Sequence, residues 1–147
     1  MLIRDVMNSG ARPALAETMH FAAERHRQIV HNIANLDTPN FQPKDLSVKD
    51  FRSALRAAVV ARRAEASGSD TGAFTPPRTK EWNHRGDGTI EVEPRTPSQN
   101  ILYHDRNNRD LERLMQDLSE NGLQFRFAAD VMRQQGELLR AAISQRS

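Results

Sequence analysis

A long heptad pattern in the last third of the chain constrains the fold most strongly. Small or apolar residues recur there at alternating intervals of four and three, over 33 residues without a proline. They are Leu111, Met115, Leu118, Gly122, Phe125, Ala129, Met132, Gly136, Leu139 and Ile143. This spacing is typical of the narrow seam of a coiled coil. A helix of that length would extend roughly 50 Å. We therefore expect a C-terminal coiled-coil helix over 105–147, with Asn107 or Asn108 as its N-cap.

The two positions of this heptad differ in size. One position is always large, whereas the other becomes small at its centre, where Gly122, Ala129 and Gly136 lie. Each glycine costs a helix about 1 kcal/mol relative to alanine. Two such costs on one seam predict that a neighbouring backbone passes close to it. The alternative is that a long helix merely tolerates both glycines.

A second seam of the same kind lies near the N-terminus. Its positions are Leu15, Met19, Ala22, His26, Ile29, Ile33 and Leu36. They predict a coiled-coil helix over 14–36, preceded by a flexible arm over 1–13. The helix should end near Asn35, because Pro39 disfavours helical backbone at the residue before it.

The part between the two seams is less regular. We expect a turn and a short helix within 37–64, the helix running from about 49 to 63. Residues 65–104 should form an irregular or β-containing middle segment. Within that segment, Trp82 could begin a hairpin with a strand over 89–93, where polar and apolar residues alternate. The fold class is thus mostly α and elongated, with the N- and C-terminal helices paired as a coiled coil.

Composition narrows the class further. Aromatic residues make up 5% of the chain, which disfavours an all-β fold. Cysteine is absent, which excludes disulfides and thiolate sites. No apolar run is long enough for a transmembrane helix, and the first ten residues lack the apolar region of a cleaved signal peptide. The net charge of +2 is too small and dispersed for an expected nucleic-acid surface.

Apolar residues beside each seam need cover that one copy of the chain cannot supply. They are Ala23, Val30, Ala34, Leu114, Leu123, Phe127, Val131 and Leu138. Contiguous exposed apolar surface marks interaction sites. We therefore expect the chain to associate with itself or with related subunits.

Candidate chemistry is sparse. His20, Glu24, Arg27 and His31 share one helix face, but Arg27 would repel a metal ion there, so we expect a solvated face. We predict no catalytic residue, cofactor or metal. Asn32 and Asn35 are interpreted as side chains that bond the backbone at a helix junction.

Several motifs at these helix boundaries resemble a known family. Residues 32–41 (NIANLDTPNF) are similar to the N-terminal signature of the bacterial flagellar axial proteins. Residues 44–46 and 51–55 resemble the FlgB family of basal-body proximal rod proteins in particular, and 105–112 and 121–125 resemble its C-terminal pattern. Asn40 stands where that family usually has glycine. Since asparagine tolerates left-handed φ, the turn should survive.

The resemblance implies a structural component of the flagellar basal-body rod, which transmits motor torque across the periplasm. Its expected partners are copies of itself in a helical rod, other flagellar rod proteins, the rod–MS-ring junction protein and the type III export gate. It would be exported without a cleaved signal peptide. The expected assembly interface consists of the ten C-terminal seam positions together with N-terminal ones: Leu15, Met19, Ala22, Ile29, Ile33, Asn32, Asn35, Asp37, Thr38 and Pro39. The alternatives are a soluble helical adaptor or export chaperone and, less favoured, an arginine-rich nucleic-acid binder.

Overall fold

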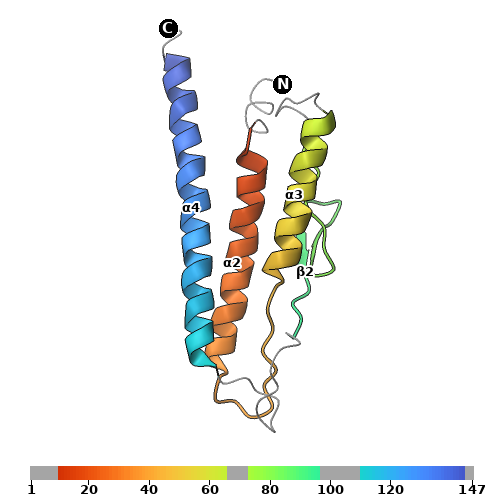
Figure 1. The fold of residues 1–147 in the computed structure, drawn as a ribbon, viewed down its shortest axis with the longest axis vertical. Coiled ribbons are helices and arrows are strands. Elements are labelled where there is room, and N and C mark those ends of the chain that lie inside the picture. The colour runs from red at the N-terminus through yellow and green to blue at the C-terminus, as the bar shows by residue number, and fades with distance from the viewer. Residues whose placement is uncertain (1–9, 66–72, 97–109, 145–147) are drawn as a thin grey trace.

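Three helices and one small hairpin make up the computed structural model, which describes residues 10–65, 73–96 and 110–144. In chain order they are α2 (Arg12–Ala34), α3 (Val48–Glu65), β1 (Trp82–His84), β2 (Ile90–Val92) and α4 (Leu111–Ser144). Helix α2 lies between α4 and α3, and both neighbours run opposite to it (Figure 1). The N- and C-terminal helices therefore pack side by side in an elongated, mostly helical molecule, which confirms the predicted fold class.

Both ends of α2 follow from local chemistry. The helix begins at Arg12, two residues before the expected start at 14, because Pro13 suits the first helical turn. It ends at Ala34, where the backbone N–H of Asn35 donates to His31 O at 3.2 Å. The segment 1–9 of the expected flexible arm lies outside the described residues.

The start of α4 is capped by an aspartate. Asp110 Oδ1 accepts the backbone N–H of Arg113 at 3.0 Å, which satisfies an N–H of the first turn. The expected caps, Asn107 and Asn108, lie outside the described residues. The helix has 34 residues and α2 has 23. The difference is roughly 17 Å at 1.5 Å per residue, and the last turns of α4 extend past α2 (Figure 1).

The hydrophobic core lies on the other side of α2 from α4. Phe21, Leu46, Phe51 and Trp82 are its fully buried members. The rings of Phe21 and Phe51 stack with their centroids 4.0 Å apart, and Trp82 meets both edge-on. This core was not predicted. Phe21 lies beside the seam, so α2 buries a broad face instead of the narrow stripe that its spacing suggested.

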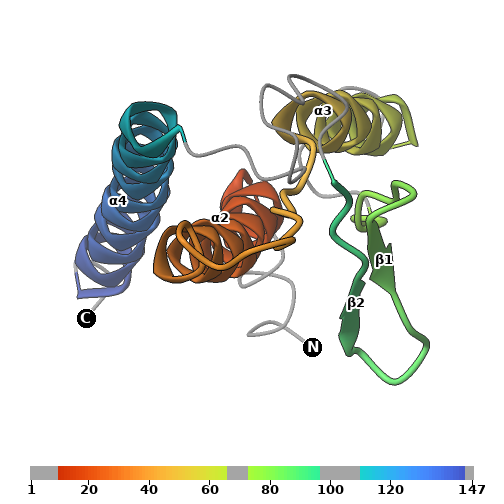
Figure 2. The same ribbon diagram turned by 90° about the horizontal axis from the view of Figure 1, so that it is seen from below.

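The hairpin that supplies Trp82 lies where the sequence predicted it. Trp82 pairs with Val92, and His84 pairs with Ile90, in an antiparallel ladder. Glu17 on α2 holds this hairpin: its Oε2 accepts Trp82 Nε1 at 3.4 Å and lies 2.9 Å from His84 Nε2. Figure 2 shows α2 between α4 and the side of the molecule that carries α3 and the hairpin. Helix α4 therefore packs outside the core.

The contact between α2 and α4 buries few α4 residues completely. Asn121 and Ala128 are the buried residues of α4, each one position before a predicted seam residue. Apart from the neighbouring residues and local backbone of α4 itself, no described atom lies within 4 Å of a Cβ built on Gly122 or Gly136. The close backbone approach predicted at these glycines is therefore absent within the described chain. The face of α4 that packs against α2 is centred on Asn121 and Ala128. It is therefore rotated by one residue from the predicted seam.

Candidate assembly interface

A buried arginine joins three segments of the chain. Arg25 on α2 donates to both carboxylate oxygens of Asp45. Its Nε lies 3.0 Å from Oδ1 and 3.3 Å from Oδ2, and its Nη2 lies 2.9 Å from Oδ2. The same Nη2 reaches Asp117 Oδ1 on α4 at 3.0 Å. Burial lowers the pKa of Arg25, but the hydrogen bonds and charges of Asp45 and Asp117 outweigh it, so its pKa lies above its ordinary value. The guanidinium thus ties α4 to α2 and to the segment after it.

Asn32 fixes the chain where it turns back from α2. Its Nδ2 donates to Lys44 O at 2.7 Å, and its Oδ1 accepts the Lys44 N–H at 3.1 Å. The side-chain amide thus pairs with both backbone groups of Lys44, as a neighbouring strand would. Asn35 Nδ2 donates to His31 O at 2.9 Å, within the same helix end. Both asparagines bond backbone carbonyls as predicted, although only Asn32 does so across the junction.

The turn between these asparagines and the core is exposed. Asn40 adopts φ 58°, the left-handed conformation predicted to be tolerable at this position. Asp37, Thr38 and Pro39 lie on the surface of this turn. Phe41 packs its ring against His31, with centroids 5.4 Å apart. The turn therefore forms an exposed, mostly polar surface at this end of α2.

Asn121 forms the second polar joint between the terminal helices. Its side chain is buried, and Nδ2 donates to Ala22 O at 2.8 Å. Its Oδ1 makes no hydrogen bond within the described part of the chain. Leaving a buried acceptor unpaired costs a folded protein about 1–3 kcal/mol.

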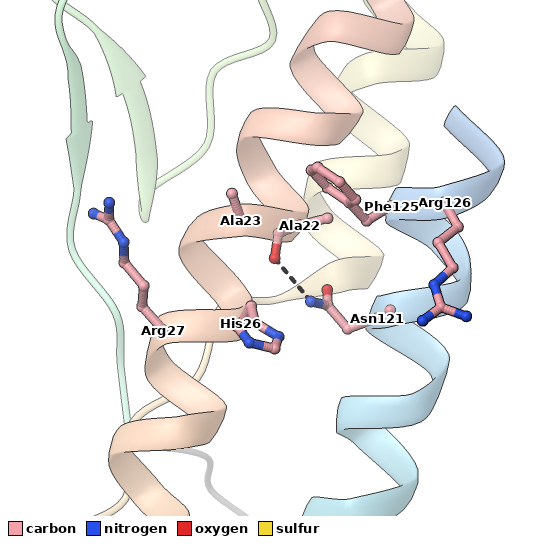
Figure 3. Close-up of a pocket in the computed structure, with 8 residues that line it drawn as sticks. Ala22, Ala23, His26, Arg27, Asn121, Phe125 and Arg126 are labelled. Carbon is pink, nitrogen blue, oxygen red and sulfur yellow. Dashed lines mark hydrogen bonds between the residues drawn. The ribbon is translucent and has the colours of Figure 1, made fainter. Parts of the chain in front are cut away.

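An apolar groove runs beside this joint, between α2 and α4 (Figure 3). Its volume is about 360 Å³. Small residues from both helices line it, together with one large ring, a histidine between the helices and two arginines at the edges. The lining residues are Ala22, Ala23, His26, Arg27, Asn121, Gly122, Phe125 and Arg126. His26 is exposed here, and the predicted seam opens into the groove instead of closing over it.

The face of α4 away from α2 carries large apolar side chains in solvent. Leu123, Phe127 and Leu138 are 66%, 70% and 68% exposed, and we call them the outer strip. These are three of the residues that the sequence predicted to need cover. Val30 on α2 is also exposed, whereas Leu114 and Val131 are partly covered.

The expected interface residues fall into three groups. Ala22, Ile29 and Asn32 are buried within the chain. The half-buried ones are Leu15, Met19, Ile33, Asn35, Leu118, Gly122, Ala129, Met132, Gly136 and Leu139. Asp37, Thr38, Pro39, Leu111, Met115, Phe125 and Ile143 are exposed and remain accessible to another molecule.

Sequence reasoning missed the two polar joints. Arg25 lies three residues after Ala22 and four before Ile29, so it shares their face, and that position was the available signal. Asn121 directly precedes the seam residue Gly122, so a search for the apolar seam passed over it. In the described ranges no three His, Asp or Glu side chains gather as a metal site would require. Among the same residues no helix is long and apolar enough to cross a membrane.

The chain is similar to flagellar basal body rod proteins. No protein family model matches it. The particular relatives are proteins called flagellar basal body rod protein FlgB, from Escherichia coli K12 and from Shigella flexneri. Each is 29% identical over 116 residues, which cover 79% of this chain and 80% of the relative. FlgB of Salmonella typhimurium is 28% identical over the same length. These matches confirm the resemblance to the FlgB family that the motifs indicated.

Proposed function

We propose that this chain is a FlgB-type structural subunit of the bacterial flagellar basal-body rod. The observation that carries the proposal is the similarity to FlgB proteins over about four-fifths of both chains. The paired terminal helices support it, because they leave the outer strip and the groove for neighbouring subunits. In this role the chain acts by packing, not by catalysis.

We further propose that the subunits assemble helically and transmit torque. A surface that contacts a different surface of the next copy builds an open filament. Close-packed helices resist compression, so many such contacts give a stiff shaft. The proposed partners are copies of the chain, other rod proteins, the rod–MS-ring junction protein and the type III export gate. The proposed site of the assembled subunit is the periplasmic rod, reached without a cleaved signal peptide.

Deletion of the gene in the source bacterium tests this proposal. We expect the deletion strain to be non-motile in soft agar and its basal bodies to lack a rod in electron cryo-tomograms. The chain expressed from a plasmid should restore both, and purified basal bodies should contain it. Complete rods in the deletion strain would overturn the proposal.

The same strains separate the rod subunit from an export chaperone or adaptor. A chaperone would be required for rods but would be absent from purified basal bodies. We expect an immunoblot of basal bodies to detect the chain together with the other rod proteins. Its absence from basal bodies that carry rods would favour the adaptor.

A further inference from the structure

The groove between α2 and α4 has the features of an unfilled docking site. Ala23 and Gly122 line it, and no described atom beyond the neighbouring residues and local backbone of α4 lies within 4 Å of a Cβ at Gly122. Asn121 lies between the two helices in the same wall (Figure 3). It is 2% exposed, yet its Oδ1 lacks a donor within the described residues. Because this oxygen is itself buried, a partner would cover the open apolar surface of the groove beside it.

The charge at the edges of the groove is positive. Arg27 on α2 and Arg126 on α4 line its edges, and His26 lies between the helices. The Arg27 side chain is largely exposed and contacts Glu24 at 3.0 Å. A partner that enters the groove should therefore carry negative charge beside its apolar residues.

The outer strip of α4 has this combination. Leu123 and Phe127 lie on one face with Glu120 and Asp130, at intervals of three, four and three residues. All four residues are exposed. Glu120 Oε1 accepts Gln116 Nε2 at 2.8 Å, and Asp130 contacts Arg133 at 3.2 Å, so both carboxylates already point along the helix surface.

We propose that the outer strip of one copy docks in the α2–α4 groove of the next copy. Leu123 and Phe127 would fill the space beside Ala23 and Gly122, and Glu120 and Asp130 would meet Arg27 and Arg126. Phe127 lies about 140° around α4 from Gly122 at 3.6 residues per turn. The two docking surfaces are thus different faces of one molecule, and the contact can repeat without closing. The inference deepens the proposed function by naming the partner surface.

Charge reversal in the purified full-length chain tests the docking. We expect sedimentation velocity to show that the wild-type chain associates as its concentration rises. The double variant Arg27→Glu/Arg126→Glu should remain monomeric. Mixing it with Glu120→Arg/Asp130→Arg should restore association, because each variant keeps one intact surface and the reversed surfaces match. Arg56→Glu, an exposed arginine on α3, is the matched control and should associate like the wild type.

Disulfide trapping supplies a second readout, since the chain has no cysteine of its own. Under oxidation, Ala23→Cys mixed with Phe127→Cys should give a covalent dimer about tenfold faster than Ala23→Cys mixed with Arg56→Cys, because docking raises the local thiol concentration. Equal rates would overturn the docking, as would a monomeric wild type or reversed charges that change nothing. These results do not depend on motility. A chain that restores rods but fails here would leave the proposed function standing, and one that docks here but is absent from rods would overturn only that function.

Discussion

At the scale of single residues, a few polar side chains hold segments that are distant in the sequence. Arg25 contacts Asp45 and Asp117, Asn32 brackets Lys44, and Asn121 reaches Ala22. Each has a hydrogen-bond geometry that a substitution can test without disturbing the aromatic core.

Arg25→Ala should lower the free energy of unfolding by about 2 kcal/mol, the loss typical of hydrogen bonds to charged groups. The two carboxylates are about one-quarter exposed. Their partial hydration keeps the loss below the roughly 3–5 kcal/mol of a fully buried pair. Urea denaturation followed by circular dichroism measures it. Arg25→Lys keeps the charge but cannot span both carboxylates, so we expect an intermediate loss; a stability equal to the wild type in both variants would contradict the role of this joint.

The hairpin turn contains a carboxylate whose pKa reports its hydrogen bonds. The Thr89 hydroxyl and backbone N–H donate to Asp87 Oδ1 at 2.6 and 2.9 Å, and they lower the pKa of Asp87 below its ordinary value. A lowered folded-state pKa means that this contribution to stability is present above the unfolded pKa and is lost as pH falls through the folded one. In Thr89→Val we expect the Asp87 pKa to rise toward the ordinary value in an NMR titration. An unchanged value would show that the hydroxyl is not the cause.

The sequence predicted some of these residues and missed others for a physical reason. Asn40 lies in the turn after α2 and Asn32 lies in the last turn of α2 beside it, where the nearby chain limits what an asparagine can do, so both were anticipated. Arg25 and Asn121 sit within helices, and their partners are 20, 92 and 99 residues away. The periodicity of apolar residues describes one helix at a time. It does not show which side of that helix faces the neighbouring helix.

At the scale of elements, the phenylalanines of α3 and α4 differ in how deeply they are buried. Phe51 on α3 is fully buried against Phe21, whereas Phe127 on α4 is mostly in solvent. Phe51→Ala should lower the free energy of unfolding by about 3–5 kcal/mol, as expected for a phenylalanine removed from a packed core.

Phe127→Ala is the matched substitution on the exposed face. It should change the stability of the free chain by less than about 0.5 kcal/mol, the usual range for surface positions. If chemical denaturation gave the two variants equal losses, α4 would be packed against something in the free chain.

A substitution at a glycine of α4 can distinguish an effect on the stability of one copy from an effect on assembly. Space around Gly136 is open, and leucine is the better helix former by about 1 kcal/mol. Gly136→Leu should therefore leave expression and the melting temperature of the free chain unchanged or slightly raised. It should block rod assembly, because overpacking a close contact costs about 1–3 kcal/mol. Normal motility of the deletion strain when it expresses Gly136→Leu would show that no other subunit packs against Gly136.

The positions of the helices were predictable, but the face that α4 turns toward α2 was not. The seam at Gly122 and Phe125 was read as the line of contact, and burial falls instead at Asn121 and Ala128. A stripe of apolar residues identifies a surface that needs a partner. Which partner covers it depends on the competition between the same chain and other copies.

At the scale of the whole molecule, the elongated shape was predictable and the core was not. Two long amphipathic segments without proline leave few alternatives to terminal helices of unequal length. The core, by contrast, combines Phe21, Leu46, Phe51 and Trp82 from four separated segments. Each contributes one large side chain, so no window of the sequence contains a periodic signal for it.

The placement of α4 outside this core implies two levels of cooperativity in one small chain. Its described residues bury only Asn121 and Ala128, while α2, α3 and the hairpin share the aromatic cluster. Local opening follows such differences in buried contacts. In amide hydrogen exchange of the free chain, we expect the backbone of α4 to lose protection at lower denaturant than that of α2 and α3. A C-terminal segment that detaches while the remainder stays folded could be handed from its own chain to a growing polymer end, whereas uniform protection would mean that the subunit joins as a rigid block.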